Sequence, residues 1–347
     1  MKYNNLPGTE IKVSEICLGT MTFGEQNSES EGHEQMDMAL DMGVNFFDTA
    51  EMYAVPSTPE NNGKTEEFIG TWFAKSGNRD KVILATKVTG PNPGLEKYVA
   101  KNLGFSRPRI MEAVDRSLKR LKTDYLDLYQ LHWPERVTNM FGVRGFTSND
   151  HEKWEDNIAD VVNTLQDLVK AGKIRHYGLS NETPWGVMRF LNEADKIGFE
   201  RPLSIQNPYG LLNRTYEVGL SEISIRENVG LLAYSPLAFG LLSGKYHTGK
   251  DSSRDRRNKY KQLSRYDSQQ CYDATSKYLD IADRHGLSLA QMSLAFVNSR
   301  PFVTSTIIGA TNLDQLKENI NSSDILLSND ILKEIEAVHE LIPNPAP

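Results

Sequence analysis

The 347-residue sequence contains few cysteines, and the two present, Cys17 and Cys271, lie far apart. No CxxC motif or Cys/His cluster accompanies either of them. Disulfide frameworks and zinc sites both need closely spaced groups of such residues, so neither is indicated. This cysteine usage favours a reducing compartment, and we expect no metal site.

Long apolar runs are also missing from the sequence. No uninterrupted apolar stretch reaches the roughly 18 residues that a membrane-spanning helix needs. The N-terminal stretch MKYNNLPGTEIKVSE has no apolar core of the kind found in signal peptides. We therefore expect a cytoplasmic protein with no membrane partner.

Positive charge is not in excess either. The formal net charge is -7 at pH 7, which argues against a nucleic-acid partner because such a partner requires a basic face. The basic stretch SSRDRRNKYKQLSRY is local. The apolar share of 39% and the charged share of 24% are typical of a globular protein with a large core.

Short apolar segments of strand length recur along the chain. Most of them lack clean alternation, which is typical of parallel strands that are covered on both faces. We count eight such segments, at residues 15–21, 44–50, 82–88, 125–132, 174–180, 203–209, 230–236 and 304–310.

The segments between these strands have helical periodicity, as at residues 110–121 and at 158–172, where Gly172 is expected to cap the helix. Eight alternating strand–helix units predict an α/β fold of the (β/α)8 TIM-barrel type, with an open doubly wound sheet as the alternative. A β-hairpin is expected around Pro7 and Gly8. We expect residues 1–347 to form one barrel domain.

Two connections are longer than a barrel turn requires. One runs from Pro134 to about Asn157, and the other is the basic stretch after Gly244. Long loops in compact domains are usually functional or disordered. In a barrel, loops that follow strands lie on the catalytic face, and both of these connections follow strands.

Three predicted strands end in polar side chains that a buried strand does not need, Asp48, Lys87 and His132. Taken singly, each has a simpler explanation, as a turn or helix cap, a solvated strand end or a core histidine. Tyr53 alone is an aromatic residue in a loop. Because the carboxyl ends of barrel strands meet around one cavity, however, we expect these four residues to converge.

The four residue types together suit proton transfer to a carbonyl oxygen. A nearby ammonium lowers the pKa of a phenol, so Lys87 could activate Tyr53 as a general acid. Asp48 could hold the ammonium in place, and neutral His132 could orient a carbonyl by hydrogen bonding. This chemistry fits reduction of an aldehyde or ketone by hydride.

Nucleotide-binding signatures of the usual kinds are absent. No GxGxxG motif follows a predicted strand, and GLLSGK at residues 240–245 departs from the P-loop spacing. On spacing alone, Gly240 and Gly244 are turn glycines.

Several motifs in a fixed order resemble the aldo-keto reductase family over nearly the whole chain, and the bacterial Tas-like branch in particular. They are GVNFFDTAEMY, SLKRLKTDYLDLYQLHWP, GKIRHYGLSN, IQNPYGLLNR, YSPLAFGLLSGKY and IIGATNLDQLKENI. The resemblance implies a barrel that binds NAD(P)H without a Rossmann domain and reduces a small-molecule carbonyl substrate. It also implies that Asp48, Tyr53, Lys87 and His132 are the catalytic residues.

The resemblance further implies a set of cofactor contacts. Ser180, Asn181 and Gln206 match positions that bind the nicotinamide carboxamide, and Tyr234 matches the aromatic residue that stacks on its ring. The loop that covers the pyrophosphate in the family matches Ser235, Pro236, Leu237, Gly240 and Lys245. The adenosine site matches Gly309, Thr311, Gln315, Glu318 and Asn319. Thr20 and Met21 match the floor near the nicotinamide.

One departure concerns the choice of cofactor. Gly309 and Gln315 stand where many family members have a lysine and an arginine for the 2'-phosphate of NADP. Arg254 or Arg257 of the basic stretch could supply that charge. We expect NADPH to be preferred, and NADH is not excluded.

Two other functions fit parts of the sequence. One is a Schiff-base aldolase with Lys87 as nucleophile, which a neighbouring carboxylate disfavours because it keeps the lysine protonated. The other is a non-catalytic or slow redox-sensing protein that binds NADPH, as in potassium-channel beta subunits. The substrate pocket is expected to be lined by Met21, Trp133 and residues 134–157, which indicates an apolar or aromatic carbonyl compound. The sequence does not indicate an oligomeric state.

Overall fold

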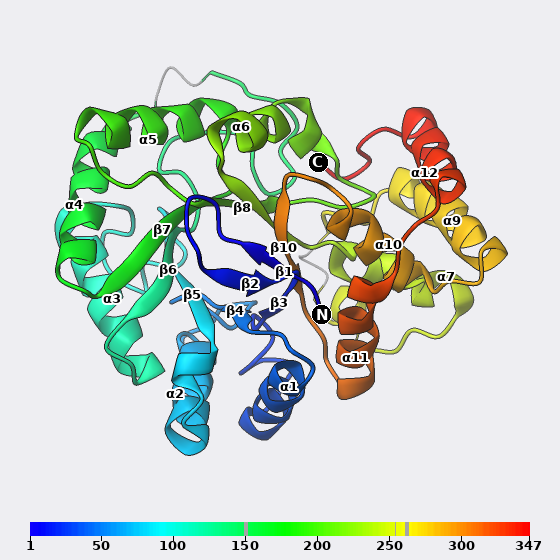
Figure 1. Ribbon diagram of the computed structural model, residues 1–347, viewed down its shortest axis with the longest axis horizontal. Coiled ribbons are helices and arrows are strands. Elements are labelled where there is room, and N and C mark those ends of the chain that lie inside the picture. The colour runs from blue at the N-terminus through cyan, green and yellow to red at the C-terminus, as the bar shows by residue number, and fades with distance from the viewer. Residues whose placement is uncertain (149–151, 254, 261–263) are drawn as a thin grey trace.

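The computed structural model describes residues 1–148, 152–253, 255–260 and 264–347. A closed barrel of eight parallel strands lies at its centre, as predicted in preference to the open sheet (Figure 1). Around the barrel the strand order is β10-β3-β4-β5-β6-β7-β8-β9. The strands are β3 (Ile16–Gly19), β4 (Phe46–Asp48), β5 (Ile83–Val88), β6 (Leu126–Leu131), β7 (Ile174–Ser180), β8 (Ser204–Pro208), β9 (Gly230–Tyr234) and β10 (Val303–Ile308).

The predicted N-terminal hairpin is confirmed as an antiparallel pair, β1 (Tyr3–Asn5) and β2 (Lys12–Ser14). It lies across one end of the barrel, in front of the strands in Figure 1. Leu6 and Val13 of the hairpin pack against inward-facing barrel residues such as Phe46. The hairpin thus closes the end of the barrel at which the strands begin, which leaves the opposite end for a site.

Helices follow the barrel strands and surround them. They are α1 (Glu29–Asp41), α2 (Lys64–Ser76), α3 (Arg107–Leu121), α4 (Ile158–Lys170), α5 (Pro184–Lys196), α6 (Leu220–Glu227), α7 (Lys245–Thr248), α8 (Arg256–Lys259), α9 (Gln269–Arg284), α10 (Leu289–Asn298), α11 (Leu313–Asn321) and α12 (Asn329–Leu341). Short 3-10 turns are η1 (Arg79–Lys81), η2 (Thr215–Val218), η3 (Ala238–Ser243) and η4 (Ser322–Asp324). Within the described residues, no helix is long and apolar enough to cross a membrane.

Local sequence signals determine where these helices begin and end. Ser28 and Glu31 form a capping box at the start of α1, which satisfies two amide groups that a free helix end leaves unpaired. Helix α4 ends at Lys170, and Gly172 follows it with a φ of 72°, a backbone conformation that glycine adopts without strain. The predicted cap at Gly172 is therefore confirmed.

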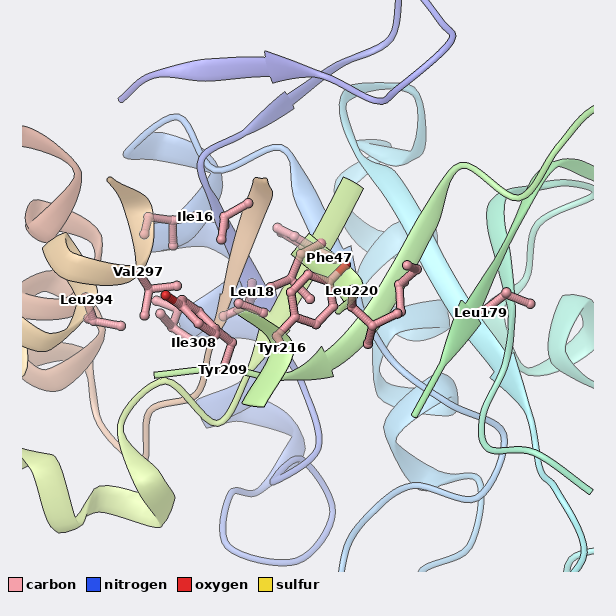
Figure 2. Close-up of a cluster of buried hydrophobic side chains, with 14 of the residues drawn as sticks. Ile16, Leu18, Phe47, Leu179, Tyr209, Tyr216, Leu220, Leu294, Val297 and Ile308 are labelled. Carbon is pink, nitrogen blue, oxygen red and sulfur yellow. The ribbon is translucent and has the colours of Figure 1, made fainter. Parts of the chain in front are cut away.

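The main hydrophobic core lies between the outer face of the barrel and the helices. Figure 2 shows Ile16 and Leu18 of β3 in this layer, with Leu294 and Val297 of α10 in the same cluster. Inside the barrel, by contrast, apolar side chains fill only the end near the hairpin. Polar side chains replace them toward the carboxyl ends of the strands, where Asp48 and Lys87 are buried.

Two long connections border that end of the barrel, as expected. One follows β6 and includes the described residues 134–148 and 152–157, and the other lies between β9 and β10 and contains α7, α8, α9 and α10. Helices α9 and α12 pack against each other beside the barrel (Figure 1).

Candidate functional site

A cavity of about 1020 Å³ opens at the carboxyl ends of the strands. Its lining combines side chains from several strand ends with residues of both long connections. Every residue predicted to contact the cofactor lines it: Thr20, Met21, Ser180, Asn181, Gln206, Tyr234, Ser235, Pro236, Leu237, Gly240, Lys245, Gly309, Thr311, Gln315, Glu318 and Asn319. Asp48, Tyr53 and His132 also line it, whereas Lys87 lies just behind the surface with 0% exposure.

Asp48 and Lys87 form a buried ion pair at the base of the cavity. Lys87 Nζ donates hydrogen bonds to Asp48 Oδ2 at 2.6 Å and to the Thr49 carbonyl oxygen at 2.8 Å. Burial opposes the charge of Lys87, but Asp48 and Tyr53 outweigh it and raise the pKa of the lysine. Lys87 is therefore an ammonium at neutral pH.

Tyr53 lies over this pair, with its ring centre 4.9 Å from Lys87 Nζ. The loop that carries Tyr53 is held by buried Glu51, which is ion-paired with Arg109 and accepts the Thr89 amide at 2.7 Å. Burial raises the pKa of Tyr53 above its usual value, although Lys87 acts in the opposite direction. The expected net lowering of this pKa is wrong, because burial outweighs the ammonium.

His132 completes the group at the end of β6. Its ring and that of Tyr53 make a T-shaped contact, with 5.6 Å between ring centroids. Burial lowers the pKa of His132 well below its usual value, and the charge of Lys87 adds to the effect. His132 is therefore a neutral imidazole, as the sequence analysis expected, and its buried Nδ1 has no hydrogen-bond partner among the described residues.

A set of oriented amide groups lies beside these four residues. Asn181 Nδ2 donates to the His132 carbonyl oxygen at 2.8 Å, and its Oδ1 accepts from Tyr234 Oη at 2.6 Å. Ser180 Oγ donates to the Gln206 carbonyl oxygen at 2.9 Å. These bonds fix the side chains that border the cavity between β7, β8 and β9, so this wall is preorganised for a planar polar ligand.

The segment after β9 bends sharply around the middle of the cavity. Ser235, Ala238 and Phe239 have φ values of 53°, 49° and 54°, and Gly240 follows with 88°. Successive residues in such conformations turn amide groups toward one side, which suits an anion. Lys245 adds an ammonium, which is ion-paired with Asp255.

The far end of the cavity lies at the start of α11. Asn312 caps this helix by accepting the Gln315 amide at 2.9 Å, and Gln315 Oε1 in turn accepts from the Thr311 amide at 3.1 Å. Glu318 accepts a hydrogen bond from Ser288 at 2.6 Å. The helix start and these hydrogen-bonding side chains form a polar end wall.

The family is decided by comparison with known proteins. A family model described as "Aldo/keto reductase family" matches residues 15–340. The chain belongs to the aldo/keto reductase family. Members of this family are oxidoreductases that generally use NADPH or NADH, and the predicted family membership is confirmed.

Three relatives illustrate the range of this family. The chain is 50% identical over 347 residues to "Protein tas" of Escherichia coli (strain K12), covering 100% of both chains. It is 34% identical over 346 residues to "Uncharacterized oxidoreductase YrpG" of Bacillus subtilis (strain 168), covering 99% of this chain and 97% of that one. It is 31% identical over 351 residues to "Probable voltage-gated potassium channel subunit beta" of Arabidopsis thaliana, covering 99% of this chain and 98% of that one.

One polar residue that the sequence analysis missed completes the base of the site in this aldo/keto reductase. Gln130 Nε2 donates to Asp48 Oδ1 at 3.1 Å, and Gln206 Nε2 donates to the same oxygen at 2.8 Å. Gln130 is the next-to-last residue of β6 and lies two residues before His132. A polar side chain near the carboxyl end of a buried strand was the signal that could have identified it.

The basic stretch differs from what the sequence suggested. Arg257 does not line the cavity, because it is buried against Tyr272 and ion-paired with Asp267. Arg254 lies outside the described residues. The neighbouring Arg256 lines the cavity instead.

The substrate side of the cavity includes expected and unexpected residues. Met21, Trp133 and Phe141 of the 134–157 loop line it, as predicted. The C-terminal residues 345–347 also line it, and Arg144 and Arg265 donate hydrogen bonds to their carbonyl oxygens at 3.0 and 3.2 Å. Local sequence patterns could not place this tail, since only the tertiary fold brings it there.

Proposed function

We propose that this aldo/keto reductase reduces an aldehyde or ketone to an alcohol with NADPH, and that residues 1–347 act as one catalytic barrel domain. The observation that carries this proposal is the convergence of a protonated phenol, a buried ammonium–carboxylate pair and a neutral imidazole at one end of a large cavity. This combination suits proton donation to a carbonyl oxygen. Bound NADPH would supply the hydride.

Tyr53 is proposed as the proton donor. Its raised pKa keeps the hydroxyl protonated at neutral pH, which is the form needed in the direction of reduction. Lys87 stabilises the phenolate that remains after proton transfer, since its ammonium lies beside the ring. Asp48 holds Lys87 charged and oriented.

His132 is proposed to orient the carbonyl. A neutral imidazole can donate a hydrogen bond to the carbonyl oxygen without competing with Tyr53 as an acid. Asn181 Nδ2 donates hydrogen bonds to the His132 carbonyl oxygen and to Ser180 Oγ, which fixes the backbone at His132. The imidazole thus approaches the substrate from a constrained strand end.

The cavity has donors that fit a dinucleotide. Ser180, Asn181 and Gln206 would hold the nicotinamide carboxamide, and Tyr234 would stack on its ring. The pyrophosphate would be bordered by Ser235, Pro236, Leu237, Gly240 and Lys245. The nicotinamide would lie against Thr20 and Met21, and the adenosine would lie against Gly309, Thr311, Gln315, Glu318 and Asn319. NADPH is proposed as the preferred cofactor over NADH. The positive end of the α11 dipole favours its added phosphate, although Asp314 in the first turn of α11 and Glu318 act against it.

A second candidate function is slow or non-catalytic binding of NADPH as a redox sensor. The relative named as a potassium channel subunit motivates this candidate. A Schiff-base aldolase is disfavoured, because Lys87 is charged, has 0% exposure and donates to two fixed oxygens.

Titration of the purified protein with NADPH and NADH, followed by turnover of an aromatic aldehyde, tests the proposal. We expect quenching of tryptophan fluorescence, tighter binding of NADPH, and loss of NADPH absorbance only when the aldehyde is added. Binding without turnover across a panel of carbonyl compounds would favour the redox sensor. Failure to bind either nucleotide would contradict both candidates.

A further inference from the structure

The cavity wall around Tyr53 is apolar but carries positive charge. Met21, Met52, Val55, Trp133 and Phe239 form much of the wall at this end. Three arginines also line the cavity, Arg144, Arg256 and Arg265. Among the described residues, none of them is ion-paired with an Asp or Glu side chain, whereas the neighbouring Lys245, Arg257 and Lys259 are.

Two of these arginines already have oxygen partners. Arg144 Nη2 donates to the Pro345 carbonyl oxygen at 3.0 Å, and Arg265 Nε donates to that of Pro347 at 3.2 Å. They hold the C-terminal segment at the cavity mouth. Among the described residues, this leaves Arg256 as the cavity-lining arginine without an oxygen partner.

Arg256 is half-buried in the wall, at the start of α8. Its guanidinium carbon is 4.6 Å from the centroid of the Phe239 ring, and its Nη2 is 3.8 Å from Met21 Sδ. Its Nε is buried and has no hydrogen-bond partner among the residues that the structure describes. An aromatic face and a thioether are weak partners for a guanidinium, which has five N–H donors.

The cationic residues near Arg256 differ from it, because they have carboxylate partners. Lys245 is ion-paired with Asp255, and Arg257 is ion-paired with Asp267. Burial lowers the pKa of Arg256, while Tyr53 and other nearby tyrosines oppose this effect. A guanidinium remains charged in proteins, and no carboxylate among the described residues offsets the desolvation of this half-buried charge.

We propose that Arg256 is a specificity-determining residue that binds an oxyanion, a carboxylate or a phosphate, on the carbonyl substrate of this enzyme. The planar guanidinium fits either group through two parallel N–H···O bonds. An anion held there, beside Met21 and within electrostatic range of Tyr53, would lie next to the proposed proton donor. The inference rests on the proposed carbonyl reduction.

Matched pairs of aldehydes test this inference. The first pair is 4-carboxybenzaldehyde and methyl 4-formylbenzoate, which are similar in shape but differ in charge. The second pair is glyceraldehyde 3-phosphate and glyceraldehyde. We expect the wild-type enzyme to prefer the anionic member of at least one pair by roughly ten- to a hundredfold in kcat/KM, the range of a charge-assisted hydrogen bond. The preferred pair identifies the anion.

Variants of α8 then assign the preference to one side chain. Arg256→Gln should abolish the preference through a raised KM for the anionic aldehyde, while leaving turnover of the neutral aldehyde and the Kd for NADPH unchanged. Arg256→Lys should retain part of the preference, since it keeps the charge without the planar fork. Lys259→Gln removes an exposed charge from the same helix. It should leave the ratio of kcat/KM between the anionic and the neutral aldehyde unchanged in both pairs.

Three results would overturn the inference. These are equal turnover of both members in both pairs, a preference that persists in Arg256→Gln, and a loss in that variant of NADPH affinity rather than of anion preference. The third result would assign Arg256 to the cofactor. Failure of wild-type enzyme to reduce any of the four aldehydes contradicts the proposed function itself, and the neutral members of the pairs separate that failure from failure of the anion site.

Discussion

Lys87 Nζ donates a hydrogen bond to Asp48 Oδ2 at 2.6 Å, and neither side chain is more than 4% exposed. The other carboxylate oxygen of Asp48 accepts from Gln130 and Gln206. A buried ion pair is compatible with stability only when its remaining hydrogen-bonding groups are satisfied, and here the two glutamines do this. The pair therefore contributes to the stability of the barrel and also positions Lys87 for the proposed chemistry of Tyr53.

Removing one partner of this ion pair should destabilise the protein more than the loss of the pair as a whole would suggest. Asp48→Asn and Lys87→Met are each expected to lower the free energy of unfolding by about 3–5 kcal/mol, because each leaves a buried polar or charged partner uncompensated. The double variant should lose less than the sum of the two losses, since no unpaired charge remains. Urea unfolding of the four proteins measures the coupling.

An exposed ion pair provides the control. Arg226 and Glu222 of α6 are 73% and 69% exposed, so Arg226→Gln should change the free energy of unfolding by about 1 kcal/mol or less. Simple additivity of the Asp48 and Lys87 losses would contradict the coupling described above.

The pH dependence of reduction follows from the signs of two pKa shifts. The raised pKa of Tyr53 keeps its proton in place until the pH exceeds about 10, the ordinary value for tyrosine. The lowered pKa of His132 keeps its ring neutral as the pH falls below about 6.5, the ordinary value for histidine. We expect kcat/KM for carbonyl reduction to be level between these limits.

Initial rates across this range, with folding monitored by circular dichroism at each pH, provide the measurement. An alkaline loss of activity centred at roughly pH 8 would show that Lys87, rather than burial, dominates the titration of Tyr53.

Asp255 should compete with the cofactor for Lys245. The two side chains form an ion pair beside the loop that begins at Ser235, so Lys245 must leave or share this partner to meet a pyrophosphate. We expect Asp255→Asn to tighten NADPH binding by a few-fold, and Lys245→Met to weaken it by roughly tenfold or more, as for a charge-assisted hydrogen bond.

Fluorescence titration at two salt concentrations measures both effects, and the difference between wild type and Asp255→Asn should shrink at high salt. Weaker binding in Asp255→Asn would mean that the carboxylate positions the lysine rather than competing for it.

The barrel was predictable from the sequence because its strands are buried on both faces and alternate with amphipathic segments. Convergence of Asp48, Lys87 and His132 followed from that topology, since strand ends meet at one end of a barrel. Gln130 was not predicted, because its role depends on which face of β6 points into the closed barrel.

Other features depended on packing that local patterns do not encode. Arg256 and Arg257 are adjacent and chemically identical in sequence, yet the helical turn of α8 directs only the first into the cavity. The sign of the Tyr53 pKa shift was mispredicted for a similar reason, because the degree of burial is a property of the whole fold. The C-terminal segment reaches the cavity through a contact between the Ala346 amide and the Leu212 carbonyl oxygen that spans distant parts of the chain.

The proton-donor role of Tyr53 is tested most directly by Tyr53→Phe, which removes one hydroxyl and keeps the ring that packs against Lys87 and His132. Tyr3→Phe, which removes a hydroxyl from an exposed tyrosine, is the matched control. The measurement is kcat for reduction of an aldehyde at saturating NADPH, together with the Kd for NADPH. We predict that Tyr53→Phe lowers kcat by about 10²–10⁴-fold with no change in Kd, while Tyr3→Phe changes neither. Undiminished kcat in Tyr53→Phe would contradict the account.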